Sequence, residues 1–522
     1  MLPFAFTIFA GAFLLFAVEP LIGKFILPWF GGGPGVWTAC LLFFQTALLA
    51  GYAYAHLSAT RLTPRRQVVL HLVLLAVALA LLPIVPGANW KPIDGSNPVA
   101  RILLLLAATV GVPFFVLAAT GPLVQRWFSQ ALPDRSPYRL YALSNAGSLI
   151  ALLAYPFYFE RVYSRQTQAL LWSVGLGVFA LGAVWCARQV WKLPAAGPAP
   201  APTTPESPAP AAARVPFTDR LLWFGLAAVA SILLLATTNK LCQDVAVVPF
   251  LWILPLALYL LSFILCFDHP RWYARGLFAA LFAAGTLIDA YLLYARNDAP
   301  LGLQIVCYVS TLFAACMVCH GEIYRIRPPA AQLTSFYLHI ATGGAVGALF
   351  VAVAAPLVFD DYFELQAGLW LLTYLVGVVA FRTRSRALAF GTAAGALLAG
   401  LLIPGFKAYT LSSIEPPAIA YFEETLTLLR EQWALVAFLV AAFLLGVAGR
   451  RIWLREWRPR TGNFLMLFSV AVGAVMLAQI HDDTRYAFAT SRDFYGVLKI
   501  FEHDTDSETL HNFRLVHGST SH

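Results

Sequence analysis

Long apolar runs follow one another along most of the chain and are separated by short polar or basic loops. A membrane-spanning helix needs roughly 20 apolar residues, and about fifteen runs reach or approach that length. They fall near residues 3–27, 35–57, 67–86, 98–125, 138–158, 165–187, 219–238, 247–267, 274–294, 301–320, 333–357, 364–381, 387–404, 433–449 and 462–480. The pattern predicts an all-α polytopic membrane protein that ends in a short β-prone tail.

Composition supports a membrane environment: 60% of the residues are hydrophobic and 12% are charged, whereas soluble domains carry about 25% charged residues. The net charge of +9 invites a nucleic-acid partner, but basic loops of a polytopic protein explain it, and no basic stripe or base-stacking module accompanies it. Nearly all of the seven cysteines lie in apolar runs and suggest no disulfide framework. The N-terminus lacks a basic segment and a cleavage site, which favours an uncleaved first helix.

Arginine and lysine gather in every second loop, for example at Arg65, Arg126, Arg188, Arg325 and Arg384. The positive-inside rule assigns these loops to the cytoplasm. We therefore expect a multi-pass protein of the cell's inner (plasma) membrane with a cytoplasmic N-terminus. Fifteen spans would place the tail outside the cytoplasm, whereas an enzyme domain that uses a cytosolic nucleotide-like donor requires the opposite side.

The first and second sets of six runs resemble each other. With a shift of 200 positions, glycines, prolines and acidic residues coincide: Gly121 with Gly321, Gly147 with Gly347, Pro156 with Pro356, and Glu160 with Asp360. Six helices return the chain to the same side, so the repeats would be parallel, as in major facilitator transporters. Chance matching in a Gly/Ala/Leu-rich chain is the alternative.

These patterns predict five segments. A first six-helix repeat covers residues 1–190, a Pro/Ala-rich cytoplasmic linker 191–217, and a second six-helix repeat 218–382. About three additional transmembrane helices cover 383–481, and the β-prone tail covers 482–522.

Charged residues inside the spans are candidates for a ligand site, because a charge in the hydrocarbon region costs at least about 2.5–3.5 kcal/mol. Glu19 and Lys24 both lie in the first run, where they either contribute to such a site or pair with each other. Lys24 also has the option of extending to the membrane interface. Further polar groups predicted to line a cleft between the repeats are Gln45, Tyr141, Asn145, Asn239, Lys240, Asp244 and Asp289.

Cys316-Met-Val-Cys319-His320 matches the attachment pattern of c-type haem. Haem is attached outside the cytoplasm, whereas Arg325 and Arg327 place this helix end inside, so we expect no haem and no other cofactor. A metal site here lacks a second pair of ligands. His320 and Glu322 remain candidates for a titratable pair at the cytoplasmic mouth. Alternatively, they are a loop pair that caps the helix end and contacts Arg325.

Several motifs together resemble the fused major-facilitator/spermidine-synthase-like membrane proteins, over essentially the whole chain. The motifs are Phe16–Lys24, Gly31–Trp37, Tyr141–Ser148, Cys319–Glu322, Phe336–Leu338, Gly343–Gly347, Arg492–Leu498 and Leu515–Gly518. The resemblance implies a membrane domain followed by an aminopropyltransferase-like domain that binds decarboxylated S-adenosylmethionine through a Gly-rich turn. Here His517 stands where the synthase strand carries an aspartate, and the printed sequence ends before any such turn.

We therefore expect the membrane helices to carry the function, with no catalytic residues in this chain. The leading hypothesis is a transporter-like domain that binds or moves a small hydrophilic ligand, for example a polyamine-like cation. The alternatives are a membrane-anchored aminopropyltransferase whose catalytic domain is missing or supplied by a partner chain, and a structural membrane subunit.

Overall fold

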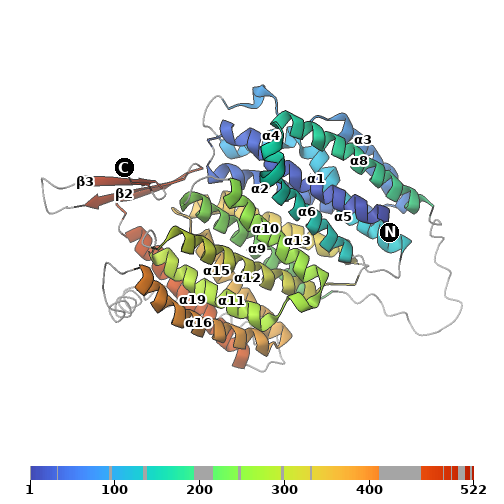
Figure 1. Ribbon diagram of the computed structural model, residues 1–522. Helices are drawn as coiled ribbons and strands as arrows, with labels where there is room; N and C mark the ends of the chain where they lie inside the picture. The colour runs from blue at the N-terminus through green and yellow to red at the C-terminus, as the bar shows by residue number, and fades with distance from the viewer. Residues whose placement is uncertain are drawn as a thin grey trace, which may run out of the picture.

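The computed structural model describes residues 2–31, 33–92, 97–132, 138–192, 215–244, 249–295, 299–329, 332–410, 460–485, 487–494, 496–503, 512–517 and 520–521. Most of the predicted linker 191–217 and the apolar run near 433–449 lie outside these residues. The protein is an all-α polytopic membrane protein with a small sheet near its C-terminus (Figure 1).

The first half contains seven longer helices, several of which begin at a proline, whose missing N–H costs nothing in a first helical turn. They are α1 (Leu2–Ile26), α2 (Pro34–Arg61), α3 (Pro64–Ala80), α4 (Pro98–Thr109), α5 (Gly111–Ala131), α6 (Tyr138–Ala154) and α8 (Arg165–Trp191), with the short α7 (Glu160–Val162) before the last.

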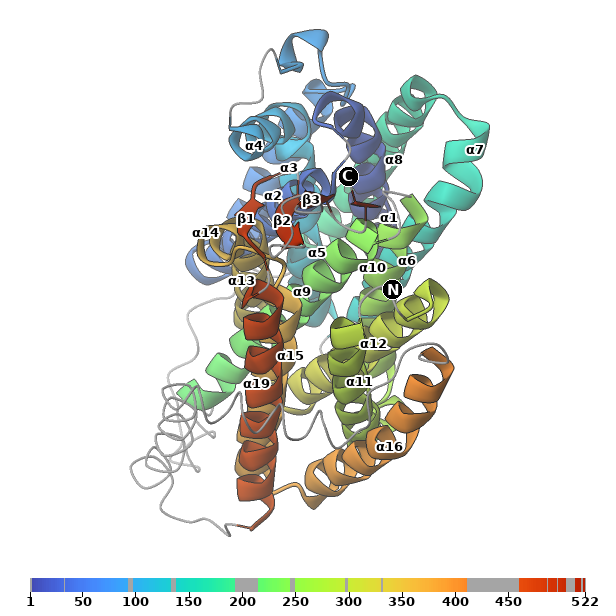
Figure 2. The ribbon, with the colours of Figure 1, turned by 90° about the vertical axis from the view of Figure 1, so that its left-hand side faces the viewer.

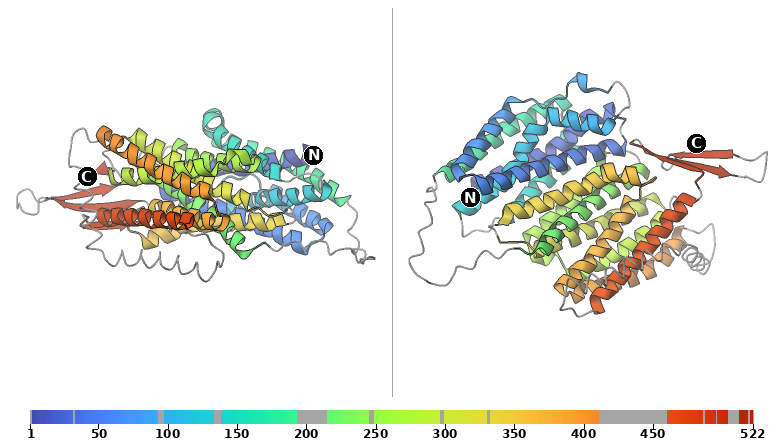
Figure 3. Two further views of the ribbon diagram at one scale, coloured as in Figure 1. Left: turned by 90° about the horizontal axis from the view of Figure 1, so that it is seen from below. Right: turned by 180° about the vertical axis from the view of Figure 1, so that it is seen from behind.

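The second half contains α9 (Phe217–Asp244), α10 (Pro249–Asp268), α11 (Arg275–Ala295), α12 (Leu301–Arg325), α13 (Leu333–Leu349), the short α14 (Ala355–Val358) and α15 (Glu364–Thr383). Two additional helices, α16 (Arg386–Thr410) and α19 (Arg460–Arg485), pack against α11 and α15, respectively. Figure 3 shows the two halves side by side.

Within the described residues, 11 helices are long and apolar enough to cross a membrane. The expectation of one continuous helix over 98–125 is wrong, because α4 and α5 meet at an angle of 73°. Pro113 explains the break: its ring would clash with the carbonyl of Thr109 in a continuous helix, and it has no N–H to donate. Counted as one span, this pair brings the number to 12.

Helices pair in the same way in the two halves. In the first half α1 packs against α6 and α8, and α2 packs against α5; in the second, α9 packs against α13 and α15, and α10 against α12. Between the halves, α2 packs against α13 and α6 against α10. Each of these pairings has a counterpart when the helices of one half are matched in order with those of the other, as a repeat of six helices predicts.

One further feature recurs near the matched prolines Pro156 and Pro356. Both α6 and α13 continue into a π-helical turn, at Tyr155–Phe159 and Phe350–Ala354. A proline at 156 or 356 cannot donate the regular helical hydrogen bond, which favours the wider turn.

Glycines allow the central helices to approach closely in both halves. A Cβ atom on Gly147 would lie 2.7 Å from the carbonyl oxygen of Phe9 in α1, and one on Gly347 would lie 2.4 Å from that of Ala228 in α9. Small residues of this kind are the usual contacts between membrane helices. Gly147 and Gly347 therefore have the same packing role in the two halves. The matched glycines at 121 and 321 do not, because a Cβ atom on Gly121 would meet nothing within 4 Å, whereas one on Gly321 would lie 2.4 Å from the Tyr273 ring.

The C-terminal strands β1 (Ala489–Arg492), β2 (Val497–His503), β3 (Asn512–His517) and β4 (Thr520–Ser521) form an antiparallel sheet in the order β1-β2-β3-β4. The sheet lies at the opposite end of the bundle from Leu2 (Figure 1). Figure 2 looks from this end and shows β1 and β2 in front of the junction between the two halves.

Candidate functional site

A cavity of about 150 Å³ lies between the two halves. Its walls come from α1, α2, α5, α6 and α8 of the first half and from α9, α10 and α13 of the second. Most of the lining is apolar. The polar residues that line it are Thr7, Glu19, Gln45, Tyr52, Thr120, Tyr141, Ser144, Asn145, Ser148 and Tyr259.

Glu19 is the charged residue of this lining. Its side chain comes from the C-terminal third of α1, immediately before Pro20, and the residue is 4% exposed. Its Oε2 atom has no hydrogen-bond partner among the described residues. A buried carboxylate oxygen of this kind is available to a bound cation or proton.

Lys24 does not pair with Glu19, and it lies outside the cavity lining. Its Nζ is 2.6 Å from Oε1 of Glu160, beyond the π-helical turn that follows α6. Both side chains are partly exposed, at 38% and 26%. Lys24 therefore has a structural partner, and the mutual pair considered from the sequence is wrong because helix α1 carries the two side chains to different neighbours.

An aromatic wall completes one side of the cavity. The ring of Tyr141 stacks on Tyr337, with centroids 4.8 Å apart and planes 13° apart, and contacts Phe263 edge-on at 5.8 Å. The Asn145 amide donates to the carbonyl oxygen of Tyr141 at 3.1 Å. Tyr259 joins this wall from α10. Aromatic faces attract cations through their quadrupole, so the wall suits the same kind of ligand as Glu19.

Gln45 links the two halves across the cavity. Its Nε2 donates to Oγ of Ser231 in α9 at 3.1 Å. Gly344 leaves the space for this amide, because a Cβ atom there would lie 2.8 Å from Oε1 of Gln45. The predicted residues Glu19, Gln45, Tyr141 and Asn145 thus lie around one cavity.

Asp289 does not join them. It lies on α11, outside the cavity lining, and is 1% exposed, with an Oδ1 atom that has no partner in the described part of the chain. The prediction grouped it with Glu19 because both are acidic groups in spans. The tertiary structure separates them, since α11 packs against α12 and α16.

His320 and Glu322 do not form a pair, because residues two apart on a helix point in different directions. The Nδ1 of His320 is 2.7 Å from Oγ of Ser262, and its ring stacks on Phe263, so it supports the aromatic wall from behind. Glu322 accepts two hydrogen bonds from Arg275, at 2.7 and 2.5 Å, and not from Arg325 as the alternative expected.

Tyr273 completes the Glu322 site by donating its hydroxyl at 2.8 Å. Burial of the phenol, together with the carboxylate of Glu322, raises the pKa of Tyr273 well above its usual value. Arg275 and Tyr273 satisfy Glu322, which makes the group structural.

Polar contacts close the cavity toward the end that carries the basic loops. Nδ1 of His56 is 2.9 Å from the hydroxyl of Thr334, and the Tyr337 hydroxyl donates to Oε1 of Gln125 at 3.1 Å. Each contact joins the first half to the second. The sequence pattern did not single out His56, Thr334 or Gln125. Tyr337 belongs to the Phe336–Leu338 motif.

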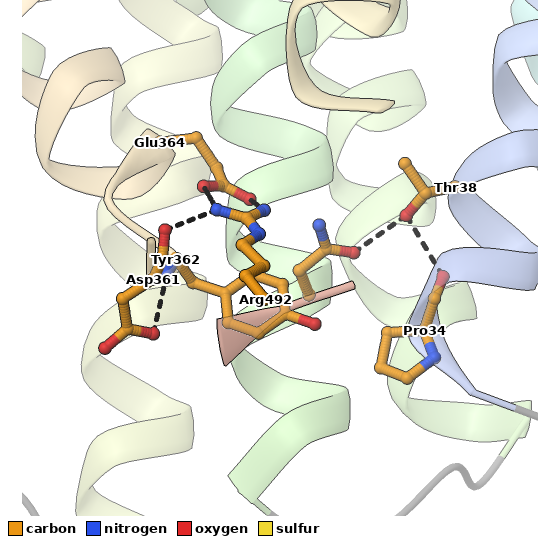
Figure 4. A network of polar contacts seen from close by, with 7 residues as sticks. Pro34, Thr38, Asp361, Tyr362, Glu364 and Arg492 are labelled. Carbon is orange, nitrogen blue, oxygen red and sulfur yellow. Dashed lines mark hydrogen bonds and ion pairs between the residues drawn. The ribbon is translucent and has the colours of Figure 1, made fainter. Parts of the chain in front are cut away.

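A second polar network lies at the other end (Figure 4). Arg492 of β1 forms a two-point ion pair with Glu364, the first residue of α15, at 2.9 and 3.2 Å. Lys499 of β2 lies 2.5 Å from Asp361. Thr38 at the start of α2 donates to Oδ1 of Asn239 near the end of α9 at 2.8 Å.

Three predicted residues lie at this end and not in the cavity. Asn239 belongs to the network, and Lys240 follows it outside the cavity lining. The side chain of Asp244 lies outside the described residues. Sequence reasoning did not assign Thr38, Glu364 or Arg492 to a site. Two signals were available: Arg492 opens one of the motifs of the resemblance, and an acidic residue opens the apolar run at 364.

Metal ligation finds no support in the described residues, where no group of three or more His, Cys, Asp or Glu side chains could hold an ion. Cys316 and Cys319 are buried free thiols in α12.

Comparison of the sequence with protein-family models and with curated proteins finds no match.

Proposed function

We propose that this chain is a transporter-like membrane protein whose central cavity binds a small hydrophilic cation. The observation that carries the proposal is Glu19: a buried carboxylate with an oxygen that has no partner among the described residues, at the wall of a cavity lined by both halves. A charge in the hydrocarbon region costs at least about 2.5–3.5 kcal/mol, so a counter-charge is expected at some stage. A protonated amine that enters the cavity supplies it.

The cavity volume limits the ligand. A cavity of about 150 Å³ is similar in size to an engineered protein cavity that binds benzene. The ligand is therefore a short amine, or one aminoalkyl end of a longer polyamine. The resemblance to the fused major-facilitator/spermidine-synthase-like proteins suggests the same class of ligand.

Charge distribution supports an orientation. Basic residues such as Arg65, Arg188, Arg325 and Arg384 lie at the ends of helices on the side of Leu2, which the positive-inside rule assigns to the cytoplasm. The sheet at residues 489–521 would then lie outside the cytoplasm of an inner (plasma) membrane. That placement favours transport over aminopropyl transfer from a cytosolic donor, whether by this chain or with a partner chain.

The test is a thermal-shift screen of the purified protein against short amines, polyamines, amino acids and adenosyl compounds. Amines should raise the melting temperature of the parent protein, and Glu19→Gln should abolish the rise. Glu160→Gln is the matched control, because it makes the same change at a carboxylate outside the cavity and should keep the amine response. No response to any amine, or an unchanged response in Glu19→Gln, would contradict the proposal. A structural subunit predicts that Glu19→Gln alters stability alone.

A further inference from the structure

The C-terminal sheet is attached to the bundle by charged side chains on one of its faces. Arg492 on β1 and Lys499 on β2 lie on the same face, since Lys499 is paired with Thr490, two residues before Arg492. Arg492 pairs with Glu364, and their side chains are 3% and 1% exposed. Lys499 pairs with Asp361. Asp361 lies in the connection that leads into α15, and Glu364 is the first residue of that helix, so both acidic partners belong to the second half.

The surroundings of Arg492 distinguish this attachment from an ordinary surface ion pair. Its guanidinium lies 4.4 Å from the centre of the Tyr362 ring, and it also donates to the carbonyl oxygen of Asp361 (Figure 4). The face of the planar guanidinium therefore contacts the Tyr362 ring, while its N–H groups donate hydrogen bonds to Glu364 and Asp361. Exposed pairs contribute little to stability, but removal of one member of a desolvated pair leaves the other charge buried without a partner.

The residues directly after Arg492 reach the first half. Phe494 packs against Gly35 at the start of α2: a Cβ atom at position 35 would lie 2.3 Å from the Phe494 carbonyl oxygen and 3.2 Å from its ring. The segment 492–494 thus lies on both halves, with its charged anchor on the second and a close packing contact on the first.

Directly beneath this segment, contacts between the halves lead to the cavity. Thr38 of α2 donates to Asn239 of α9. Leu41, which lines the cavity, is three residues further along α2, or about 4.5 Å along the helix axis. The segment 492–494 and the Thr38–Asn239 contact therefore cover the cavity on the side of the sheet.

We propose that residues 492–494 are a lid that closes the central cavity at this end and that the Arg492–Glu364 pair holds it in place. Transporters built from two repeats open by movement of one half against the other around a central site. Opening at this end separates α2 from α9 and α15, so the lid must leave either Gly35 or Glu364. The inference rests on the proposed function because the compartment it closes is the proposed ligand site.

A native thiol reports on this closure without any ligand. Cys40 is 1% exposed and lies between Thr38 and Leu41 in sequence. In a variant that keeps Cys40 as its single cysteine, reaction with a membrane-impermeant maleimide added on the sheet side measures how far this buried part of α2 becomes accessible. We expect Arg492→Ala and Glu364→Gln each to accelerate labelling about tenfold or more, as loss of a buried charge partner destabilises the closed state.

Controls separate lid opening from general loosening. Arg514→Ala removes the same charge from the exposed strand β3 and should leave labelling unchanged. Arg492→Glu combined with Glu364→Arg should restore slow labelling. Gly35→Leu, which leaves the ion pair intact and displaces Phe494, should accelerate it.

Unchanged labelling in folded, monodisperse Arg492→Ala and Gly35→Leu would overturn the lid, as would an equal acceleration in Arg514→Ala. Neither result depends on the amine response of Glu19, so the lid and the proposed ligand can fail separately.

Discussion

Arg492 and Glu364 form a two-point ion pair between β1 and the first turn of α15, although they are 128 positions apart in the sequence. Both side chains are almost fully excluded from solvent. The pair connects the C-terminal sheet to the membrane bundle and lies above a cavity whose charged residue is Glu19.

Replacing Glu364 by Gln should lower the free energy of unfolding by about 3–5 kcal/mol, because Arg492 would remain buried without its counter-charge. Chemical denaturation in detergent, followed by tryptophan fluorescence, measures the change. Lys499→Ala, which breaks the more exposed neighbouring pair, should cost less. Equal costs for the two variants would show that burial does not distinguish these pairs.

Replacing Lys24 by Ala should reduce stability by less than about 1 kcal/mol, because its pair with Glu160 is partly exposed and screened by salt. The difference between parent and variant should shrink as ionic strength rises. Amine binding should persist, since neither residue lines the cavity. Loss of the amine response in this variant would show that Lys24 contributes to ligand binding.

Replacing Gly347 by Ala should destabilise the second half by about 1–3 kcal/mol, because the new Cβ would overlap the Ala228 carbonyl, a backbone atom that cannot turn aside. Gly177 on α8 is the matched control: nothing lies within 4 Å of a Cβ there. The same substitution at Gly177 should be neutral or stabilise by about 0.5–1 kcal/mol. Thermal unfolding of the two variants decides the comparison.

Replacing Gly344 by Val should weaken ligand binding with little loss of fold, because the added side chain would occupy the space of the Gln45 amide at the cavity wall. Amine-dependent thermal shifts measure the effect. Gly302, a helical glycine with nothing within 4 Å of its Cβ, provides the control substitution. Retained binding in Gly344→Val would place the ligand elsewhere.

Tyr362 should make stability fall at alkaline pH. Burial raises its pKa to about 12, while nearby Arg492 acts in the opposite direction. The unfolded phenol titrates near pH 10, so between about pH 10 and 12 the unfolded state releases a proton that the folded state retains, and unfolding becomes easier. The stability of the parent relative to Tyr362→Phe should decline across that range. A constant difference would show that the phenol is accessible to water when folded.

Much of the helical architecture could be predicted, and the exceptions are informative. The apolar runs predicted α1, α2, α8 and α9 closely, because a chain in lipid must satisfy its backbone hydrogen bonds internally and therefore forms helices. The run at 98–125 was the clearest exception. There the chain bends by 73° between α4 and α5, whereas hydrophobicity alone suggested one straight helix.

The candidate site was predicted only in part. Glu19, Gln45, Tyr141 and Asn145 were predicted and lie around one cavity. Asp289 and Glu19 are both carboxylates in apolar runs, so the sequence did not show which of them faces the cavity. That depends on which helices pack together, and the hydrophobicity of a helix does not specify its neighbours. The sequence suggested that Lys24 pairs with Glu19, five positions away. In the structure it pairs with Glu160, 136 positions away.

The sequence by itself determined which segments enter the membrane and which glycines and prolines recur in the two halves, because burial in lipid and close helix contact act on local residue types. Only the tertiary structure decided which charges are partnered. An ion pair such as Arg492–Glu364 depends on a distance in space between segments far apart in the chain, and neither composition nor helical periodicity contains that distance.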